Sequence, residues 1–212
     1  HAVAASTYVP DVQTILEIGG QDSKIILLNN GMIQMRGRIN DVINEYLGNQ
    51  SIRSDKSLTE INDHKGNGIL KFTNIRVEDH LGNSRDIYAV GESIKIVIDF
   101  ERSHSFGEVS SSRIDIGIND ELGTRITWLS TQMYMDKIPD DWDSVQFEIP
   151  SILLNEGTYN FSIFCDTSMG VADWVKNVYK LTIEFHDFFK TGRQIPANQG
   201  LLITNFVVKG NA

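Results

Sequence analysis

Residues 93–102, SIKIVIDFER, alternate apolar and polar side chains, and this alternation decides the fold class of most of the chain. Successive side chains of a β-strand point to opposite faces of a sheet, so a period of two predicts a strand with one buried face. The predicted buried face carries Ile94, Ile96, Ile98 and Phe100, and the predicted solvent face carries Lys95, Asp99 and Glu101.

The same alternation recurs on both sides of this segment. In SRIDIGIND, residues 112–120, it places Ile114, Ile116 and Ile118 inward and Arg113, Asp115 and Asn119 outward. Further strands are expected in residues 71–77, 125–131, 145–149, 159–165, 179–185 and 201–208. Short turns join them without intervening helices, which is typical of antiparallel sheets packed face to face. We therefore predict an all-β, immunoglobulin-like antiparallel β-sandwich, jelly-roll-like, of seven or eight strands.

Two other segments precede this predicted sandwich, which spans residues 69–212. Residues 1–47 contain a strand pattern, a hairpin pattern and the helix-like NDVINEYLG, with Asn40 as N-cap and Gly48 as stop. This is a short α/β segment, interpreted as the remnant of an ATPase domain. Residues 48–68 are polar and lack periodicity, so we predict a solvated linker there.

Composition and charge exclude several classes of function. The 212 residues are 41% hydrophobic and 22% charged, and the formal net charge is −9. These values indicate a globular chain and argue against nucleic-acid binding, which needs clustered lysine and arginine. The lone Cys165 lies in an apolar strand pattern, so we expect a buried thiol and a reducing, cytoplasmic location. Because the chain starts at His1, we expect a fragment of a longer protein.

Metal and catalytic motifs are weak in this sequence. PDDWDS places Asp140, Asp141 and Asp143 close together, but it lacks the spacing of a calcium loop and is interpreted as a solvated turn. The five histidines lack zinc-ligand spacing. We therefore expect no catalytic residues, no metal and no cofactor.

The order and spacing of several motifs in residues 66–208 resemble one known family. The motifs are the opening GNGILKFTNI, the strand entry VGESIKI and the turn LLNEGTY. They are similar to the C-terminal domain of Wzt, the ATP-binding subunit of ABC transporters that export O-antigen polysaccharide. The resemblance implies a non-catalytic carbohydrate-binding sandwich that recognises the non-reducing end of the polysaccharide, often as a strand-exchanged homodimer. It also implies an ABC ATPase domain and a membrane subunit as partners, and a cytoplasmic location peripheral to the inner membrane.

The N-terminal residues carry two further resemblances. IILLNNGMIQMRGRINDVINEYLG, residues 25–48, is similar to the last strands and helix of an ABC ATPase domain. Residues 1–31, which include GGQDSK, resemble instead the activator ATPases of 2-hydroxyacyl-CoA dehydratases, in which this motif lies in a phosphate loop. Between Lys24 and Gly31 one pattern runs into the other. Neither half contains a complete nucleotide site, since no G-x-x-x-x-G-K-[S/T] motif occurs, so we expect ATP only in an intact transporter subunit.

Candidate binding residues come from aromatic and polar side chains outside the predicted core. Sugar rings stack on aromatic faces while their hydroxyls bind carboxylates, amides and guanidinium groups. Tyr159, Phe161 and Tyr179 follow the inward period and are assigned to the core. The candidate carbohydrate-binding residues, in predicted strand ends and in the predicted loops at residues 127–143 and 166–177, are Trp128, Tyr134, Trp142, Trp174, Arg113, Asp115, Asp166 and Asn177. Arg113 would matter most for an anionic terminal group, because its fork suits a carboxylate or phosphate.

Two other interpretations stay open. The sandwich could be a structural dimerisation module without sugar binding, with LLITNFVV, residues 201–208, exchanged between protomers. A weaker one takes GGQDSK as a working ATPase motif.

Overall fold

The computed structural model describes residues 14–17, 24–29, 32–37, 58–60 and 63–210. The chain divides into two compact units, residues 1–51 and 52–212, and each is described by itself. In the first unit, β1 (Thr14–Glu17), β2 (Lys24–Asn29) and β3 (Met32–Gly37) form an antiparallel sheet in chain order. The expected helix after Asn40 and the glycine pair of GGQDSK lie outside the described residues. The domain boundaries at residues 47 and 68 stay a prediction.

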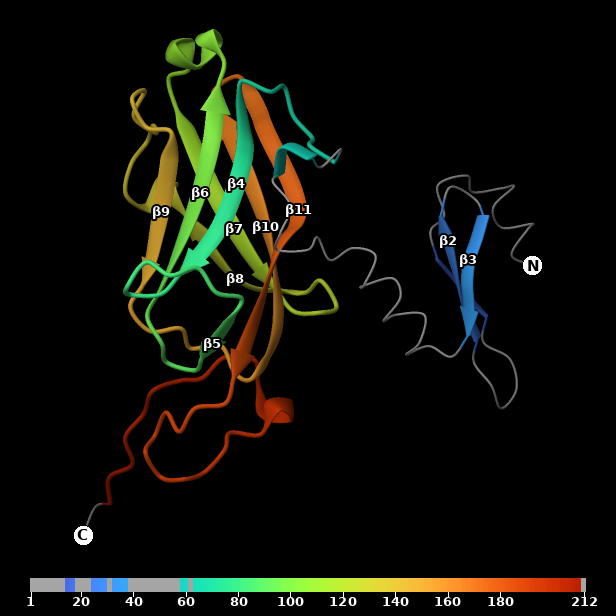
Figure 1. Cartoon of the computed structure of the whole chain (residues 1–212), viewed down its shortest axis with the longest axis vertical. Coiled ribbons are helices and arrows are strands. Elements are labelled where there is room, and N and C mark those ends of the chain that lie inside the picture. The colour runs from blue at the N-terminus through green and yellow to red at the C-terminus, as the bar shows by residue number, and fades with distance from the viewer. Residues whose placement is uncertain (1–13, 18–23, 30–31, 38–57, 61–62, 211–212) are drawn as a thin grey trace. The chain divides into compact units, whose positions relative to one another are not determined.

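The second unit is a sandwich of two sheets, which confirms the predicted all-β class (Figure 1). The three-stranded sheet has the order β4 (Leu70–Glu78), β6 (Ile94–Arg102), β9 (Ser144–Ile149). The five-stranded sheet has the order β5 (Ile87–Ala89), β11 (Gly170–Glu184), β10 (Gly157–Thr167), β7 (Ser112–Asn119), β8 (Arg125–Ser130).

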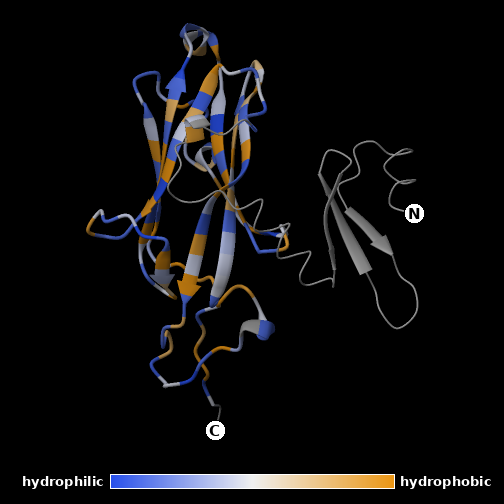
Figure 2. Ribbon diagram, turned by 45° about the vertical axis from the view of Figure 1, so that its right-hand side comes forward, coloured by the Kyte–Doolittle hydropathy of each residue, from blue (hydrophilic) through white to orange (hydrophobic). Residues whose placement is uncertain are grey.

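The core lies between the sheets, where the period of two predicted it. Apolar and polar residues alternate along the strands (Figure 2). Ile96 and Ile116 are fully buried, and Phe161 contacts Tyr179 with ring centroids 5.6 Å apart. Cys165 is also buried, and desolvation raises the pKa of its thiol, so it behaves as a core side chain. The predicted inward residues that are buried are Ile94, Ile96, Ile98, Phe100, Ile114, Ile116, Ile118, Tyr159, Phe161, Ile163, Tyr179, Leu181 and Ile183.

One strand pair departs from the predicted antiparallel arrangement. β5 pairs with β11 in parallel, with Ile87 opposite Thr182 and Ala89 opposite Glu184. The chain reaches β5 from the three-stranded sheet, not from its new neighbour β11. A hairpin fixes antiparallel pairing only between consecutive strands, so this crossing between sheets leaves β5 free to run parallel.

The last predicted strand does not form. Residues 201–208 are irregular and make a single isolated bridge, between Leu154 and Leu202. Ile203 is the buried residue of this segment, and its backbone N–H donates to the carbonyl of Leu153 at 2.7 Å. The apolar residues of this segment favoured a strand, but no strand of the described chain lies alongside it to form a ladder of backbone hydrogen bonds.

Part of the predicted linker, residues 58–60 of η1 (Leu58–Glu60) and residues 63–68, packs against the sandwich. Leu58 is buried in the sandwich core. The backbone N–H groups of Lys65 and Gly68 donate to the carbonyls of Trp174 and Ala172, at 3.1 and 3.0 Å. One buried leucine and a ladder of backbone bonds therefore hold a mainly polar segment against β11.

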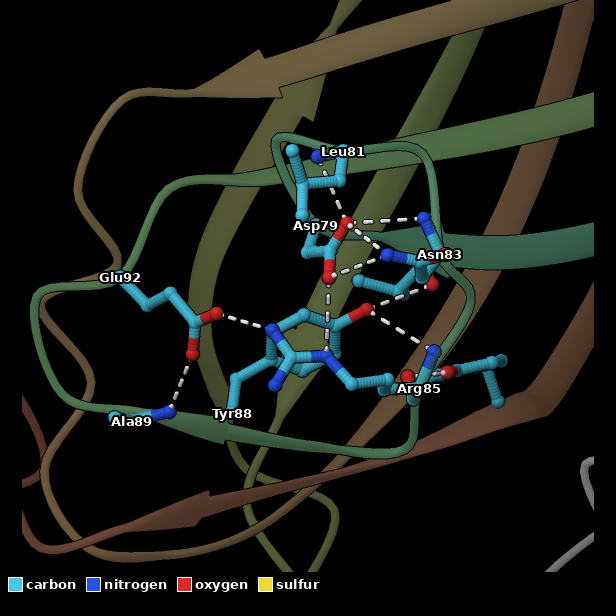
Figure 3. Close-up of polar contacts among 9 residues, drawn as sticks. Asp79, Leu81, Asn83, Arg85, Tyr88, Ala89 and Glu92 are labelled. Carbon is cyan, nitrogen blue, oxygen red and sulfur yellow. Dashed lines mark hydrogen bonds and ion pairs between the residues drawn. The ribbon is translucent and has the colours of Figure 1, made fainter.

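An ion-paired turn between β4 and β5 is drawn in Figure 3. Asp79 Oδ1 accepts the backbone N–H of Leu81 at 2.8 Å and that of Asn83 at 2.9 Å. Arg85 lies over the Tyr88 ring, 4.7 Å from its centroid, and pairs with Asp79 and Glu92. The Tyr88 hydroxyl donates to the carbonyl of Val77. This network fixes the path by which the chain leaves β4 and enters β5.

The Asp79 carboxylate makes this turn sensitive to acid. Hydrogen bonds, first among them those with Asn83, hold the pKa of Asp79 below its usual range. Its stabilising contribution is therefore present above the pKa of an unfolded aspartate, about 4. It is lost as the pH falls through the lower folded-state pKa. We expect Asp79→Asn to lower the melting temperature at pH 7 and to match the parent near pH 2.

Thermal melting across this pH range tests the prediction. Asp141→Asn, at an exposed position, is the control and should leave the melting temperature nearly unchanged at both pH 7 and pH 2. If the melting temperature of Asp79→Asn stays below that of the parent by the same amount from pH 7 to pH 2, the charge of Asp79 does not stabilise the turn.

Candidate functional site

The outer face of the five-stranded sheet gathers most of the predicted binding residues. β7 lies inside this sheet, between β10 and β8, and its isoleucines fill the core. The intervening residues, Arg113, Asp115, Gly117 and Asn119, consequently point to the opposite, outer face. Strand register then places Asp166 beside Arg113, Phe164 beside Asp115, and Trp128 beside Gly117. Trp174 lies opposite Phe164 on β11.

Arg113 is the centre of a polar cluster at one end of this face. Its Nε lies 3.4 Å from Asp115 Oδ2 and its Nη2 lies 3.8 Å from Asp166 Oδ2. Its Nη1 donates to Gln132 Oε1 at 2.9 Å. The guanidinium carbon is 5.9 Å from the centre of the Phe164 ring. One arginine therefore joins carboxylates from two strands and an amide from η3 (Thr131–Met133).

Asp115 is buried although it points away from the core. Its side chain is 9% exposed, and its Oδ1 atom lies out of solvent contact without a hydrogen-bond partner. Arg113 Nε is likewise buried and unsatisfied. Most buried polar atoms in proteins have a partner, because an unsatisfied one costs about 1–3 kcal/mol. An acceptor and a donor on this face thus lack a hydrogen-bond partner, although solvent does not reach them.

Aromatic rings continue the face beside this cluster. Phe164 and Trp174 meet edge to face, with ring centroids 6.2 Å apart and planes at 82°. The Trp174 side chain is accessible, at 37% exposure. Lys176 Nζ lies 4.6 Å from its ring centroid, a cation–π distance. An exposed indole on the same face as unsatisfied polar atoms can stack on a ring-shaped ligand while those atoms bind its polar groups.

Trp128 lies on the same face, two strands away from Phe164. It pairs with Gly117, and a side chain at position 117 would collide with Arg125. The glycine thus lets Arg125 lie over the sheet, where its Nε donates to Asn119 Oδ1 at 2.7 Å. Trp128 and Trp174 lie on β8 and β11, three strand spacings or about 14 Å apart across the sheet.

Three other predicted residues occupy different places. Asn177 adopts φ +51° at an irregularity of β11, and its backbone N–H reaches Ser162 Oγ at 3.4 Å. Tyr134 directly follows η3 and is 90% exposed, two residues from Gln132. Trp142 lies in the turn that precedes β9, a strand of the three-stranded sheet. The backbone N–H of Trp142 donates to the carbonyl of Pro139. The structure therefore places Arg113, Asp115, Asp166, Trp128 and Trp174 on one face of the five-stranded sheet, and separates Trp142 from them.

The sequence analysis misplaced Trp174 and missed three neighbours. Residues 166–177 were expected to form a loop, but β10 and β11 make a tight hairpin and Trp174 lies within β11. Phe164 alternates with the inward Ile163 and Cys165, so the period of two already marked it as an outward aromatic. No local pattern marked Gln132, which η3 brings to Arg113, or Lys176 of β11, which lies over the Trp174 ring.

Among the described residues, no group of three or more histidine, cysteine, aspartate or glutamate side chains is placed to hold a metal ion. In the predicted solvated turn, Asp140 pairs with Lys137 at 3.0 Å. No helix within the described ranges is long and apolar enough to cross a membrane.

Comparison with known proteins identifies a family. A family model described as the Wzt C-terminal domain matches residues 62–201. Among solved structures, the crystal structure of the C-terminal domain of Wzt superimposes with a TM-score of 0.55 and 12% identity, over 76% of this chain and 100% of that chain. At this identity the likeness shows the fold alone. No curated protein matches.

Two other solved structures resemble the chain more weakly. The PmoD soluble domain from Methylocystis sp. has a TM-score of 0.34 and 10% identity, over 57% of this chain and 94% of that one. The superoxide reductase (neelaredoxin) from Ignicoccus hospitalis has a TM-score of 0.35 and 7% identity, over 65% of this chain and 98% of that one. Similarity at this level carries no argument about function.

Proposed function

Since this chain belongs to the Wzt C-terminal domain family, we propose that its sandwich is a non-catalytic carbohydrate-recognition module of a polysaccharide ABC exporter. The ligand is the non-reducing terminus of an O-antigen polysaccharide. The chain's partners are the ABC ATPase domain and the membrane subunit, so it works at the cytoplasmic side of the inner membrane. ATP belongs to the intact subunit and not to this sandwich.

One observation carries the proposal. On the outer face of the five-stranded sheet, Phe164 of β10 lies between the exposed indole of Trp174 on β11 and the buried, unsatisfied Asp115 Oδ1 on β7. A saccharide has both complementary parts, an apolar C–H face for the ring and hydroxyl groups for the carboxylate. The paired strands β11, β10 and β7 hold these groups in place, so little ordering entropy is lost on binding.

Calorimetric titration tests this function. The chain is titrated with the O-polysaccharide of the strain that encodes it, and with the same polymer after removal of its non-reducing terminal residue. We expect binding to the intact polymer, loss of binding to the trimmed polymer, and no change of the polymer on prolonged incubation. Equal binding to both polymers would contradict terminal recognition, and absence of binding to either would contradict the function itself.

A second candidate function is dimerisation, which one feature of the C-terminal segment favours. Phe206, Val207 and Val208 are 62%, 79% and 84% exposed. The segment leaves the sandwich at the end where β5 lies at a sheet edge (Figure 1). Exposed apolar residues of high β propensity tend to pair with an edge strand. We infer a homodimer in which this segment is exchanged between two copies of the chain.

Truncation separates the two functions. A variant ending at Ile203 keeps the last buried side chain but removes the exposed apolar residues. We expect it to be monomeric by light scattering and to bind polysaccharide with unchanged intrinsic affinity per site. A variant lacking only residues 210–212 is the control and should remain dimeric. If the shorter variant stays dimeric, the exchanged segment is not the dimer contact.

A further inference from the structure

We propose that the outer face of the five-stranded sheet selects a neutral, hydroxyl-bearing terminal sugar and disfavours a terminus that carries a phosphate or carboxylate. This inference rests on the proposed function, because it names the class of ligand for that same face. It replaces the expectation that Arg113 serves to bind an anionic group.

The charge of Arg113 is already matched within the protein. Both of its ion pairs, with Asp115 and with Asp166, lie within 4 Å. Its third contact is the Gln132 amide oxygen, which is also an acceptor. An incoming phosphate would have to displace these carboxylates from the guanidinium group, and the displaced charges would then face the phosphate. Like charges at such distances repel, so the net effect of the cluster on an anion is unfavourable.

The surroundings of Arg113 add negative charge. A pocket between the ends of β7 and β10 is lined by Arg113, Gln132, Asp136 and Asp166. Counting Asp115 beneath it, one cation stands among three carboxylates. The other cations of this face, Arg125, Lys176 and Lys180, do not line this pocket. The pocket therefore presents acceptors to a ligand.

The unsatisfied atoms match a hydroxyl group. Asp115 Oδ1 lacks a donor, and Arg113 Nε lacks a well-aligned acceptor. A sugar hydroxyl can donate to the first and accept from the second, whereas a phosphate dianion only accepts. Both atoms are out of solvent contact, whereas the Arg113 side chain as a whole is 36% exposed, so binding requires this side chain to shift and admit the hydroxyl.

The test compares matched ligands and salt concentrations by calorimetry. The probes are the source polysaccharide, a neutral oligosaccharide of its repeating unit, and the same oligosaccharide with a phosphate on its terminal residue. We expect the neutral probe to bind with less than about a twofold change in affinity between about 50 and about 500 mM salt. We expect the phosphorylated probe to bind about tenfold more weakly at the lower salt concentration.

Asp166→Asn is the decisive variant, because it removes one negative charge while the asparagine side chain keeps the shape of the aspartate. The Asp166 side chain is 39% exposed. We expect this change to reduce the difference in affinity between the neutral and the phosphorylated probe several-fold, and to leave the melting temperature unchanged. Asp141→Asn is the matched control and should leave the difference as it is. The inference would be overturned if the phosphorylated probe bound more tightly than the neutral probe, if this binding weakened with salt, and if Asp166→Asn did not alter it. The recognition function would still hold in that case. Absence of binding to the source polysaccharide would overturn both.

Discussion

We expect replacement of Asp173 by alanine to lower the free energy of unfolding by about 3 kcal/mol, because it removes a buried carboxylate that serves several donors. The Asp173 side chain is 3% exposed. Its Oδ2 lies 2.7 Å from His64 Nδ1 and accepts the backbone N–H of Phe72 at 2.9 Å. The other nitrogen of the His64 ring, Nε2, lies 2.9 Å from the carbonyl of Leu58. Alanine leaves these donors without partners in a buried site.

Urea unfolding followed by circular dichroism measures this effect. Asp166→Ala, on the neighbouring strand, removes a partly exposed carboxylate and is the control, with an expected loss below about 1 kcal/mol. The Asp173 variant should also expose the segment around His64 to protease, since this contact ties it to β11. Equal losses for the two variants would mean that Asp173 does not anchor the segment.

The second large effect concerns binding. We expect Trp174→Ala to weaken polysaccharide binding about 30-fold, equivalent to about 2 kcal/mol, because the exposed indole supplies the stacking surface on the face that also carries Asp115. Its 37% exposure and outward position leave the core unchanged, so the melting temperature should fall little. Calorimetric titration of parent and variant with the source polysaccharide measures the change.

Trp142→Ala is the matched control for this prediction. Trp142 has the same exposure, 37%, but lies before β9 in the other sheet. We expect its removal to change affinity less than about twofold. Loss of binding in Trp142→Ala with normal binding in Trp174→Ala would move the site to the three-stranded sheet.

The period-two pattern was sufficient to predict the sandwich fold and the residues that β7 contributes to the candidate site. It identified the inward isoleucines of β6 and β7, and therefore also which residues of β7 face outward. Arg113 and Asp115 could be chosen on that basis alone. Phe164 was accessible to the same reasoning, since it alternates with two buried residues.

Other features depend on contacts between segments far apart in the chain, and no local pattern encodes them. His64 lies in a polar stretch that composition assigns to a linker, yet it meets Asp173 in β11. β5 runs parallel to β11 because the chain crosses between sheets. Residues 201–208 have a strand-like composition without a partner strand in the described chain. Trp174 was assigned to a loop because the hairpin turn at Ser168 and Met169 is shorter than the sequence suggested.

The most direct test of the account is to map the saccharide onto the sandwich by NMR. The amide and indole resonances of the isotope-labelled chain are recorded during titration with a terminal oligosaccharide of its O-polysaccharide. The account predicts shifts concentrated at Arg113, Asp115, Asp166 and the indole N–H of Trp174, on the outer face of the five-stranded sheet. Shifts confined to the three-stranded sheet, or to residues 201–208, would contradict it.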